Sequence, residues 1–298
     1  MKNTSNSIHC TNRVNFLFPA LLLALLTIPA FAQDAEPEKD KEPKKELARP
    51  AFESALLGDM QSVVVQTPKT LEWDFQHRFG TLENGIKDFF GIYANGANIR
   101  MGLTYTPINR LAVGIGITKN KMALDVNYKY AIFQQTKDDK MPVSVSFFGN
   151  TVADTQKGDY NTSPQRLSFY NELIIARRIN NKISIQISPS FSHDNAVIDS
   201  AYNNNMLAIG FGGRYKFSAQ SSVLINYTQP LSAHKNTAFN PKPGLTIAWE
   251  VSTSAHAFQM FFTSYQGILP QENVMYNPLD FTKNGVLFGF NITRLWNF

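Results

Sequence analysis

The sequence is nearly devoid of cysteine. Among its 298 residues the one cysteine is Cys10. It precedes an apolar run instead of following it directly, which is a poor position for attaching lipid to a new N-terminus. We expect cleavage to remove this residue with the rest of the leader described below, and a mature chain without cysteine has no disulfide and no thiol chemistry.

The sequence also lacks a strong excess of charge of either sign. Its 28 Lys and Arg residues against 23 Asp and Glu residues give a formal charge of +5. Removing residues 1–32 takes away Lys2, Arg13 and no acid, which lowers the charge to +3. So small an imbalance argues against nucleic acid as a partner.

Long apolar runs are missing as well. After residue 32 no stretch approaches the roughly 18 consecutive apolar residues of a membrane-spanning helix. The chain is nevertheless rich in Phe (23 residues) and Tyr (11 residues), and many of its segments alternate apolar and polar residues. A transmembrane β-barrel has this composition, because its backbone groups pair between strands and only every second side chain faces lipid.

The first 32 residues have the features of a secretory signal peptide. Met1–Arg13 is basic without an acid, Phe16–Ile28 is largely apolar, and Ala30–Ala32 supplies small residues before a cut ahead of Gln33. The alternative is a membrane anchor, but the apolar run is shorter than the roughly 20 residues that a spanning helix needs. We therefore predict that residues 1–32 are removed.

Residues 33–69 form a predicted N-terminal segment ahead of the barrel. Residues 33–50 are dominated by Glu, Lys and Pro, which is typical of a disordered tether and would place this part in the periplasm. Residues 51–68 are more apolar, with Phe52, Leu56, Leu57 and Val63–Val65. This part is expected to plug the barrel or to rest against its periplasmic rim, and the sequence leaves both places open.

Residues 70–298 contain twelve stretches in which apolar and polar residues alternate with the two-residue period of a β-strand. The clearest alternates Leu124, Val126 and Tyr128 with Asp125 and Asn127, so that apolar and polar side chains point to opposite faces. The twelve predicted strands cover residues 71–79, 99–105, 111–117, 122–130, 142–152, 166–178, 182–192, 203–217, 221–229, 244–251, 256–265 and 285–298. Strands of about ten residues match tilted membrane-crossing strands, so we predict an all-β, closed antiparallel transmembrane β-barrel of about twelve strands.

The connections between these strands support a location in the outer membrane. Five of the six segments that follow odd-numbered strands are long, whereas those that follow even-numbered strands are short. Bacterial outer-membrane barrels have this alternation, with short periplasmic turns and longer external loops. Lipid of that membrane is the first expected partner, and both chain ends should lie in the periplasm.

The C-terminal strand carries a second sign of this class. Alternate residues from Val286 to Phe298 are apolar, with Arg294 as the exception, which is tolerable near the membrane interface. An aromatic last residue resembles the C-terminal signal of Gram-negative outer-membrane barrels. That resemblance implies that Trp296 and Phe298 are read by the barrel-assembly machinery.

The chain also resembles the predicted outer-membrane β-barrels of the Bacteroidota that are known only as a domain of unknown function. The resemblance rests on Arg49–Glu53, His77–Gly80, Asp88–Gly91, Asn98–Leu103, Leu173–Arg177 and Ala208–Tyr215. It covers most of the mature chain. It implies the fold and the location, and it implies no activity, substrate or cofactor.

Charged residues on the polar parity of the strands are candidates for a lumen-facing site. They are Glu72, Asp74, Arg78, Arg100, Asp125, Lys129, Arg166, Glu172, Arg178, Arg214, Lys216 and Glu250. Side chains fill the interior of an eight-stranded barrel, whereas a sixteen-stranded barrel encloses an aqueous channel. Twelve strands are intermediate, so one hypothesis is a narrow porin-like channel for small polar or weakly anionic solutes. In the other, these charges pair across the lumen of a barrel that has a structural, binding or docking role. Oligomeric state is not predicted.

Other chemistry has little support in the sequence. Ser192 and His193 invite comparison with outer-membrane phospholipases, but neighbouring residues on a strand point to opposite faces and a nucleophile needs its base within hydrogen-bond reach. His77, His234 and His256 lack metal-ligand spacing. We therefore expect no enzyme activity, metal or cofactor. The loops Phe89–Tyr93 and Ile268–Tyr276 are possible surface docking segments.

Overall fold

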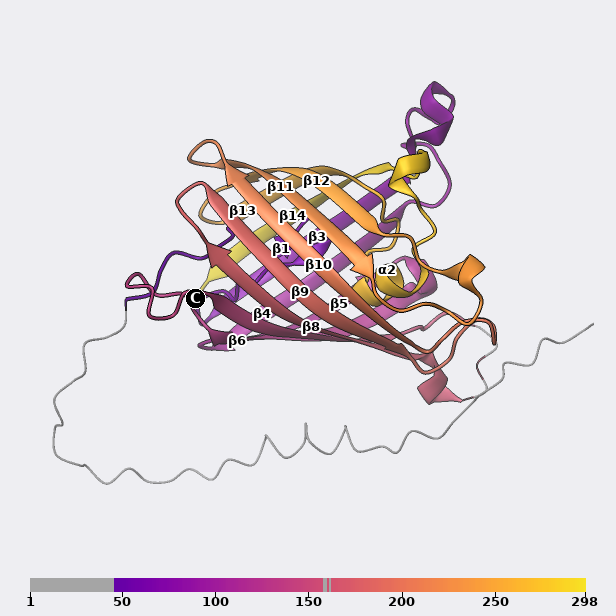
Figure 1. The fold of residues 1–298 in the computed structure, drawn as a ribbon, viewed down its shortest axis with the longest axis horizontal. Helices are drawn as coiled ribbons and strands as arrows, with labels where there is room; N and C mark the ends of the chain where they lie inside the picture. The colour runs from indigo at the N-terminus through magenta and orange to yellow at the C-terminus, as the bar shows by residue number, and fades with distance from the viewer. Residues whose placement is uncertain (1–45, 158–159, 161) are drawn as a thin grey trace, which may run out of the picture.

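The computed structural model describes residues 46–157, 160 and 162–298. The predicted signal peptide and most of the predicted tether lie outside these residues. The described chain forms a closed barrel of twelve antiparallel strands with a short hairpin inside it (Figure 1). This confirms the predicted fold class.

Every barrel strand pairs with its neighbours in the sequence, and the last strand pairs with the first to close the wall. All twelve overlap the predicted stretches. The strands are β3 (Thr70–Thr81), β4 (Asn98–Ile108), β5 (Leu111–Thr118), β6 (Ala123–Phe133), β7 (Ser144–Ala153), β8 (Leu167–Arg178), β9 (Ile183–Asp194), β10 (Asn205–Lys216), β11 (Ser221–Pro230), β12 (Gly244–Ser252), β13 (His256–Thr263) and β14 (Leu287–Asn297).

The two faces of the wall face different surroundings. On β6, Asp125 and Lys129 are buried on the inner face, whereas Leu124 and Val126 on the outer face are 47% and 56% exposed. The same outward apolar side chains recur on the neighbouring strands. Such a band is stable when it faces lipid, so the outer face of the barrel is its membrane-contacting surface. Among the described residues, the helices are all too short or too polar to span a bilayer.

The seam between β14 and β3 is lined by aromatic rings. Phe290 stacks on Phe75 and on His77, with ring centroids 5.9 and 5.3 Å apart. At the end of the chain, the backbone N–H of Phe298 donates to the carbonyl of Lys69, while the Phe298 side chain is 78% exposed. Arg294 is also exposed and contacts His256. The structure thus leaves the terminal aromatic ring accessible.

Residues 51–66 fill part of the lumen, and we call them the plug. The plug contains the hairpin of β1 (Leu56–Leu57) and β2 (Met60–Gln61), which turns at Gly58 with a positive φ of 61°. Leu57 and Met60 belong to one buried apolar cluster with Ile174, Met206 and Leu224 of the wall. Of the two places that the sequence left open, the structure shows the interior. For residues 51–66, the structure therefore differs from the predicted disordered or periplasmic segment, because their apolar side chains pack on apolar residues of the wall.

The end of the barrel opposite to the C-terminus is covered by the β13–β14 connection. Its helix α2 (Pro270–Tyr276) lies at the barrel mouth (Figure 1) and buries Val274 and Met275. The docking role considered for Ile268–Tyr276 is therefore wrong for its apolar residues, which pack inward. The same connection also contains η5 (Phe281–Lys283). Other connections contain the short 3-10 helices η1 (Leu82–Asp88), η2 (Asn120–Met122), η3 (Ser163–Arg166) and η4 (Thr237–Phe239).

Candidate functional site

The plug is held to the wall by a buried ion pair. Asp59 lies in the hairpin turn and accepts hydrogen bonds from Nε and Nη2 of Arg78 on β3, at 2.9 and 2.6 Å. Both side chains are at most 1% exposed. The second Asp59 oxygen accepts a hydrogen bond from the Thr246 hydroxyl at 2.6 Å. Buried charges are stable only when they are paired and hydrogen-bonded in this way.

Wall side chains also satisfy the backbone of the plug. Asn226 donates to the carbonyl of Leu57, Gln259 to that of Leu56 and Asn291 to that of Gly58, at 2.6, 2.8 and 2.9 Å. Further bonds come from Lys129, Ser146 and Gln186. A hairpin of two-residue strands cannot satisfy its own polar groups, so these side chains replace the missing strand partners.

A second buried network lies on the β3–β6 side of the lumen. Arg100 donates to Asp74 at 2.7 Å and to both oxygens of Asp125 at 2.9 and 2.8 Å. Glycines make room for it, because a Cβ on Gly102 would lie 2.1 Å from an Asp74 oxygen and one on Gly116 would lie 2.3 Å from Nη2 of Arg100. Gly116 on β5 thus leaves room for the Arg100 side chain to cross the lumen face of the strand.

A third cluster joins the start of the plug to the wall. Glu53 accepts hydrogen bonds from Lys216 at 2.7 Å and from Arg214 at 3.1 Å. Partial burial disfavours the charged form of Glu53, but the hydrogen bond and the positive charges of Lys216, Arg214 and Arg178 outweigh it and lower the pKa of Glu53. The plug is thus tied to the wall by charge at two separate places.

The structure places most of the predicted lumen charges on the inner wall. Nine of them are buried there: Glu72, Asp74, Arg78, Arg100, Asp125, Lys129, Glu172, Arg214 and Glu250. Arg178 and Lys216 are half-buried and contact Pro50 and Glu53. Arg166 differs, because it ends η3 in the β7–β8 loop and donates to the carbonyls of Asp154 and Gln156.

Sequence reasoning missed the two acids that the plug contributes. The predicted wall charges comprise five acids and seven bases, and Asp59 and Glu53 make the numbers equal. Neither plug acid lies in a predicted barrel strand, so alternation of side chains could not assign it to the lumen. The excess of bases on the predicted wall was the one signal that acids were to be found elsewhere.

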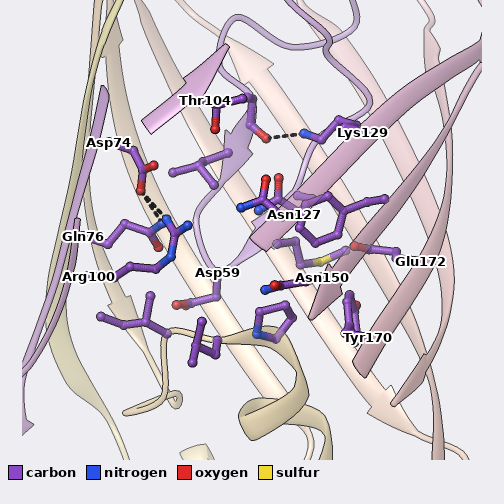
Figure 2. Close-up of a pocket in the computed structure, with 18 of the residues that line it drawn as sticks. Asp59, Asp74, Gln76, Arg100, Thr104, Asn127, Lys129, Asn150, Tyr170 and Glu172 are labelled. Carbon is purple, nitrogen blue, oxygen red and sulfur yellow. Dashed lines mark hydrogen bonds and ion pairs between the residues drawn. The ribbon is translucent and has the colours of Figure 1, made fainter. Parts of the chain in front are cut away.

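A cavity of about 80 Å³ remains between the plug, α2 and the charged side of the wall. Figure 2 shows Arg100 and Asp74 on one side of it and Glu172 and Tyr170 on the other. Lys129 lies nearby and donates to the plug carbonyls of Ala55 and Ser62, at 3.1 and 3.0 Å. By volume, the cavity has room for a few water molecules or one small solute.

The two sides of the lumen differ in character. The β8–β13 side presents apolar residues such as Ile174, Ala208 and Leu224 to the plug. The β3–β7 side presents Glu72, Asp74, Arg100 and Lys129, together with further polar residues, to the cavity. The plug therefore packs on the apolar residues of the β8–β13 side, and the cavity is left against the charged residues of the β3–β7 side.

The remaining sequence candidates do not assemble into a site. Ser192 is fully buried, whereas His193 on the outer parity contacts Asn205 and Asn195 at 2.7 and 3.0 Å. They point to opposite faces, as strand geometry predicts. In the loop considered for surface docking, Phe89 and Tyr93 are 55% and 80% exposed.

The family to which the chain belongs agrees with this architecture. A family model described as "Membrane bound beta barrel domain (DUF5777)" matches residues 52–296. Among solved structures, the NanC porin is 9% identical with a TM-score of 0.46, and covers 76% of this chain and 99% of its own. The COG4313 outer membrane channel from Pseudomonas putida F1 is 10% identical with a TM-score of 0.47, and covers 78% and 97%. No curated protein matches the chain in sequence.

Proposed function

Because the chain belongs to the family of membrane bound beta barrel domains, we propose that it is an outer-membrane barrel that passes small polar solutes along the charged side of its lumen. The plug stays docked in this account. One observation carries the proposal, namely the division of the lumen into an apolar stripe that the plug covers and a charged side that lines a cavity. Withdrawing the whole plug would expose the apolar stripe to water, so a path beside the plug costs less free energy than a path through its place.

The same geometry predicts a narrow passage. The cavity of about 80 Å³ is bounded by α2 at the external end and by the Arg100 network at the wall. Passage requires side chains or α2 to move, so conductance should be low.

Single-channel recording in planar bilayers tests the proposal, with Ala112→Trp as the diagnostic variant. Ala112 is buried and lines the cavity, and its neighbour Val113 is 42% exposed on the lipid-facing side. The refolded protein should give small steady current steps. Ala112→Trp should abolish them because the indole fills the cavity, and Val113→Trp should leave them unchanged. Conduction that persists in Ala112→Trp contradicts the passage.

A non-transporting structural or binding barrel is the second candidate function. It is favoured by the hydrogen bonds that hold the plug from Ser146, Gln186, Asn226, Gln259 and Asn291. A silent bilayer with correctly folded wild-type protein supports this candidate and contradicts the channel.

A further inference from the structure

The lumen cavity contains more acids than bases. Asp59, Glu72, Asp74 and Glu172 line it, against Arg100 and Lys129. When Arg78 and Asp125, which pair directly with lining residues, are included, five carboxylates face three basic groups. Two carboxyl groups are therefore left without a basic partner at the cavity.

The excess lies at Glu72 and Glu172. Arg78 is occupied by Asp59, and Arg100 is occupied by Asp74 and Asp125. In the part of the chain that the structure describes, neither Glu72 nor Glu172 has a basic side chain within ion-pair distance. Glu72 accepts a hydrogen bond from the neutral amide of Gln66 at 3.1 Å.

Lys129 forms no ion pair with Glu72 or Glu172, although its positive charge acts on both from a greater distance. Its ammonium group donates to the plug carbonyls of Ala55 and Ser62 and lies 5.8 Å from the centre of the Phe148 ring. The one lysine at the cavity is therefore used to hold the plug.

The neutral side chains at the cavity also favour a ligand that donates hydrogen bonds. The side-chain oxygen of Asn150 is buried and has no hydrogen-bond partner among the described residues. Asn150 and Glu172 line the same cavity (Figure 2), where the Phe148 and Tyr170 rings supply aromatic faces that attract cations. The cavity thus offers acceptors and negative charge to a ligand that carries N–H donors and positive charge.

We propose that the cavity binds a small cation of the primary-ammonium class, with Glu172, Glu72 and Asn150 as its acceptors. This assignment names the class of solute that uses the proposed passage. Transport of the cation rests on the proposed function, whereas binding of the cation in the cavity does not. It replaces the weakly anionic solutes considered from the sequence, where the predicted bases outnumbered the predicted acids. Arg214, Lys216 and Arg178, which supplied that excess, cluster around Glu53 at the start of the plug instead.

Thermal unfolding in detergent micelles tests the assignment, with methylammonium chloride and sodium acetate as probes at equal ionic strength. Methylammonium should raise the Tm of the wild-type protein and acetate should not. Glu172→Gln keeps the shape of the side chain and removes its charge, so its apparent affinity for methylammonium should fall by about tenfold, as expected for the loss of about 1.4 kcal/mol of binding energy. The control Glu83→Gln removes an exposed acid in η1 and should retain the wild-type response.

An equal or larger effect of acetate on the wild-type protein overturns the assignment even if Glu172→Gln does not fold. An undiminished response of folded Glu172→Gln also overturns it. Failure of the proposed passage alone is distinguishable from failure of the cation site. In that case methylammonium still raises the Tm, but planar bilayers with the protein show no current steps. If bilayers conduct but reversal potentials in a salt gradient show anion selectivity, the passage stands and the cation site does not.

Discussion

Arg78 on the first barrel strand and Asp59 in the plug form an ion pair of 2.6 Å with almost no access to solvent. Arg78→Met should lower the free energy of unfolding by about 3–5 kcal/mol, because it leaves the Asp59 carboxylate buried without its partner. The double variant Arg78→Met with Asp59→Asn should lose less, since it removes both charges. Chemical unfolding in micelles, followed by tryptophan fluorescence, measures both.

The Lys137–Glu46 pair is the control for this test. Its side chains are 63% and 74% exposed, so Lys137→Met should change the free energy of unfolding by at most about 1 kcal/mol. Equal losses in Arg78→Met and Lys137→Met would show that Asp59 is not buried against Arg78.

Gly116 makes room for the Arg100 network. Gly116→Ala should destabilise the barrel by about 1–3 kcal/mol, because the added methyl group overlaps the Arg100 guanidinium and the Asp125 carboxylate. Gly213→Ala is the matched control, since its Cβ would meet only the methyl group of Ile225 at 3.2 Å. If unfolding midpoints of the two variants are equal, the network is not packed as described.

The cluster around Glu53 should make plug anchoring depend on pH. The pKa of Glu53 is lowered in the folded protein, so its contribution to stability is present above the unfolded pKa of about 4.5 and is lost as pH falls through the folded value. The Tm of the wild-type protein should exceed that of Glu53→Gln at pH 7, and the difference should shrink as the pH falls below the unfolded pKa. Its size should be modest because the side chain is 36% exposed. A difference that grows on acidification contradicts the assignment.

Phe298 offers a test of the predicted assembly signal. Its ring is 78% exposed, so deleting this residue should leave the Tm of refolded protein nearly unchanged. The amount of folded barrel in the outer membrane of cells should fall, because the exposed ring is the feature that the assembly machinery is expected to read. Unchanged cellular levels would mean that Phe298 is not part of the signal.

The sequence predicts the wall of this protein better than its filling. A strand that faces lipid on one side and a lumen on the other must alternate, and this period locates all twelve strands from β3 to β14. It also places residues such as Arg100 and Asp125 on the inner face. Arg166 is misassigned because parity cannot show where a strand ends and a loop begins.

The plug and α2 follow no such local rule. The plug strands are two residues each, and the partners of Leu56, Leu57 and Gly58 are Gln259, Asn226 and Asn291, about 170–230 residues away. A local pattern cannot reveal such contacts. The cavity is created by these elements together, so its excess of acids becomes visible only when the plug is in place.

Hydrogen–deuterium exchange of the plug amides tests most directly whether the lumen is filled by residues 51–66. The amide of Gly58 donates to Gln259, and that of Ser62 donates to the carbonyl of Ala55. Peptides covering these residues should exchange as slowly as the barrel strands, since opening them requires breaking the buried Arg78–Asp59 pair. Exchange of the plug amides at the rate of an unfolded peptide, while the strands stay protected, would contradict the account.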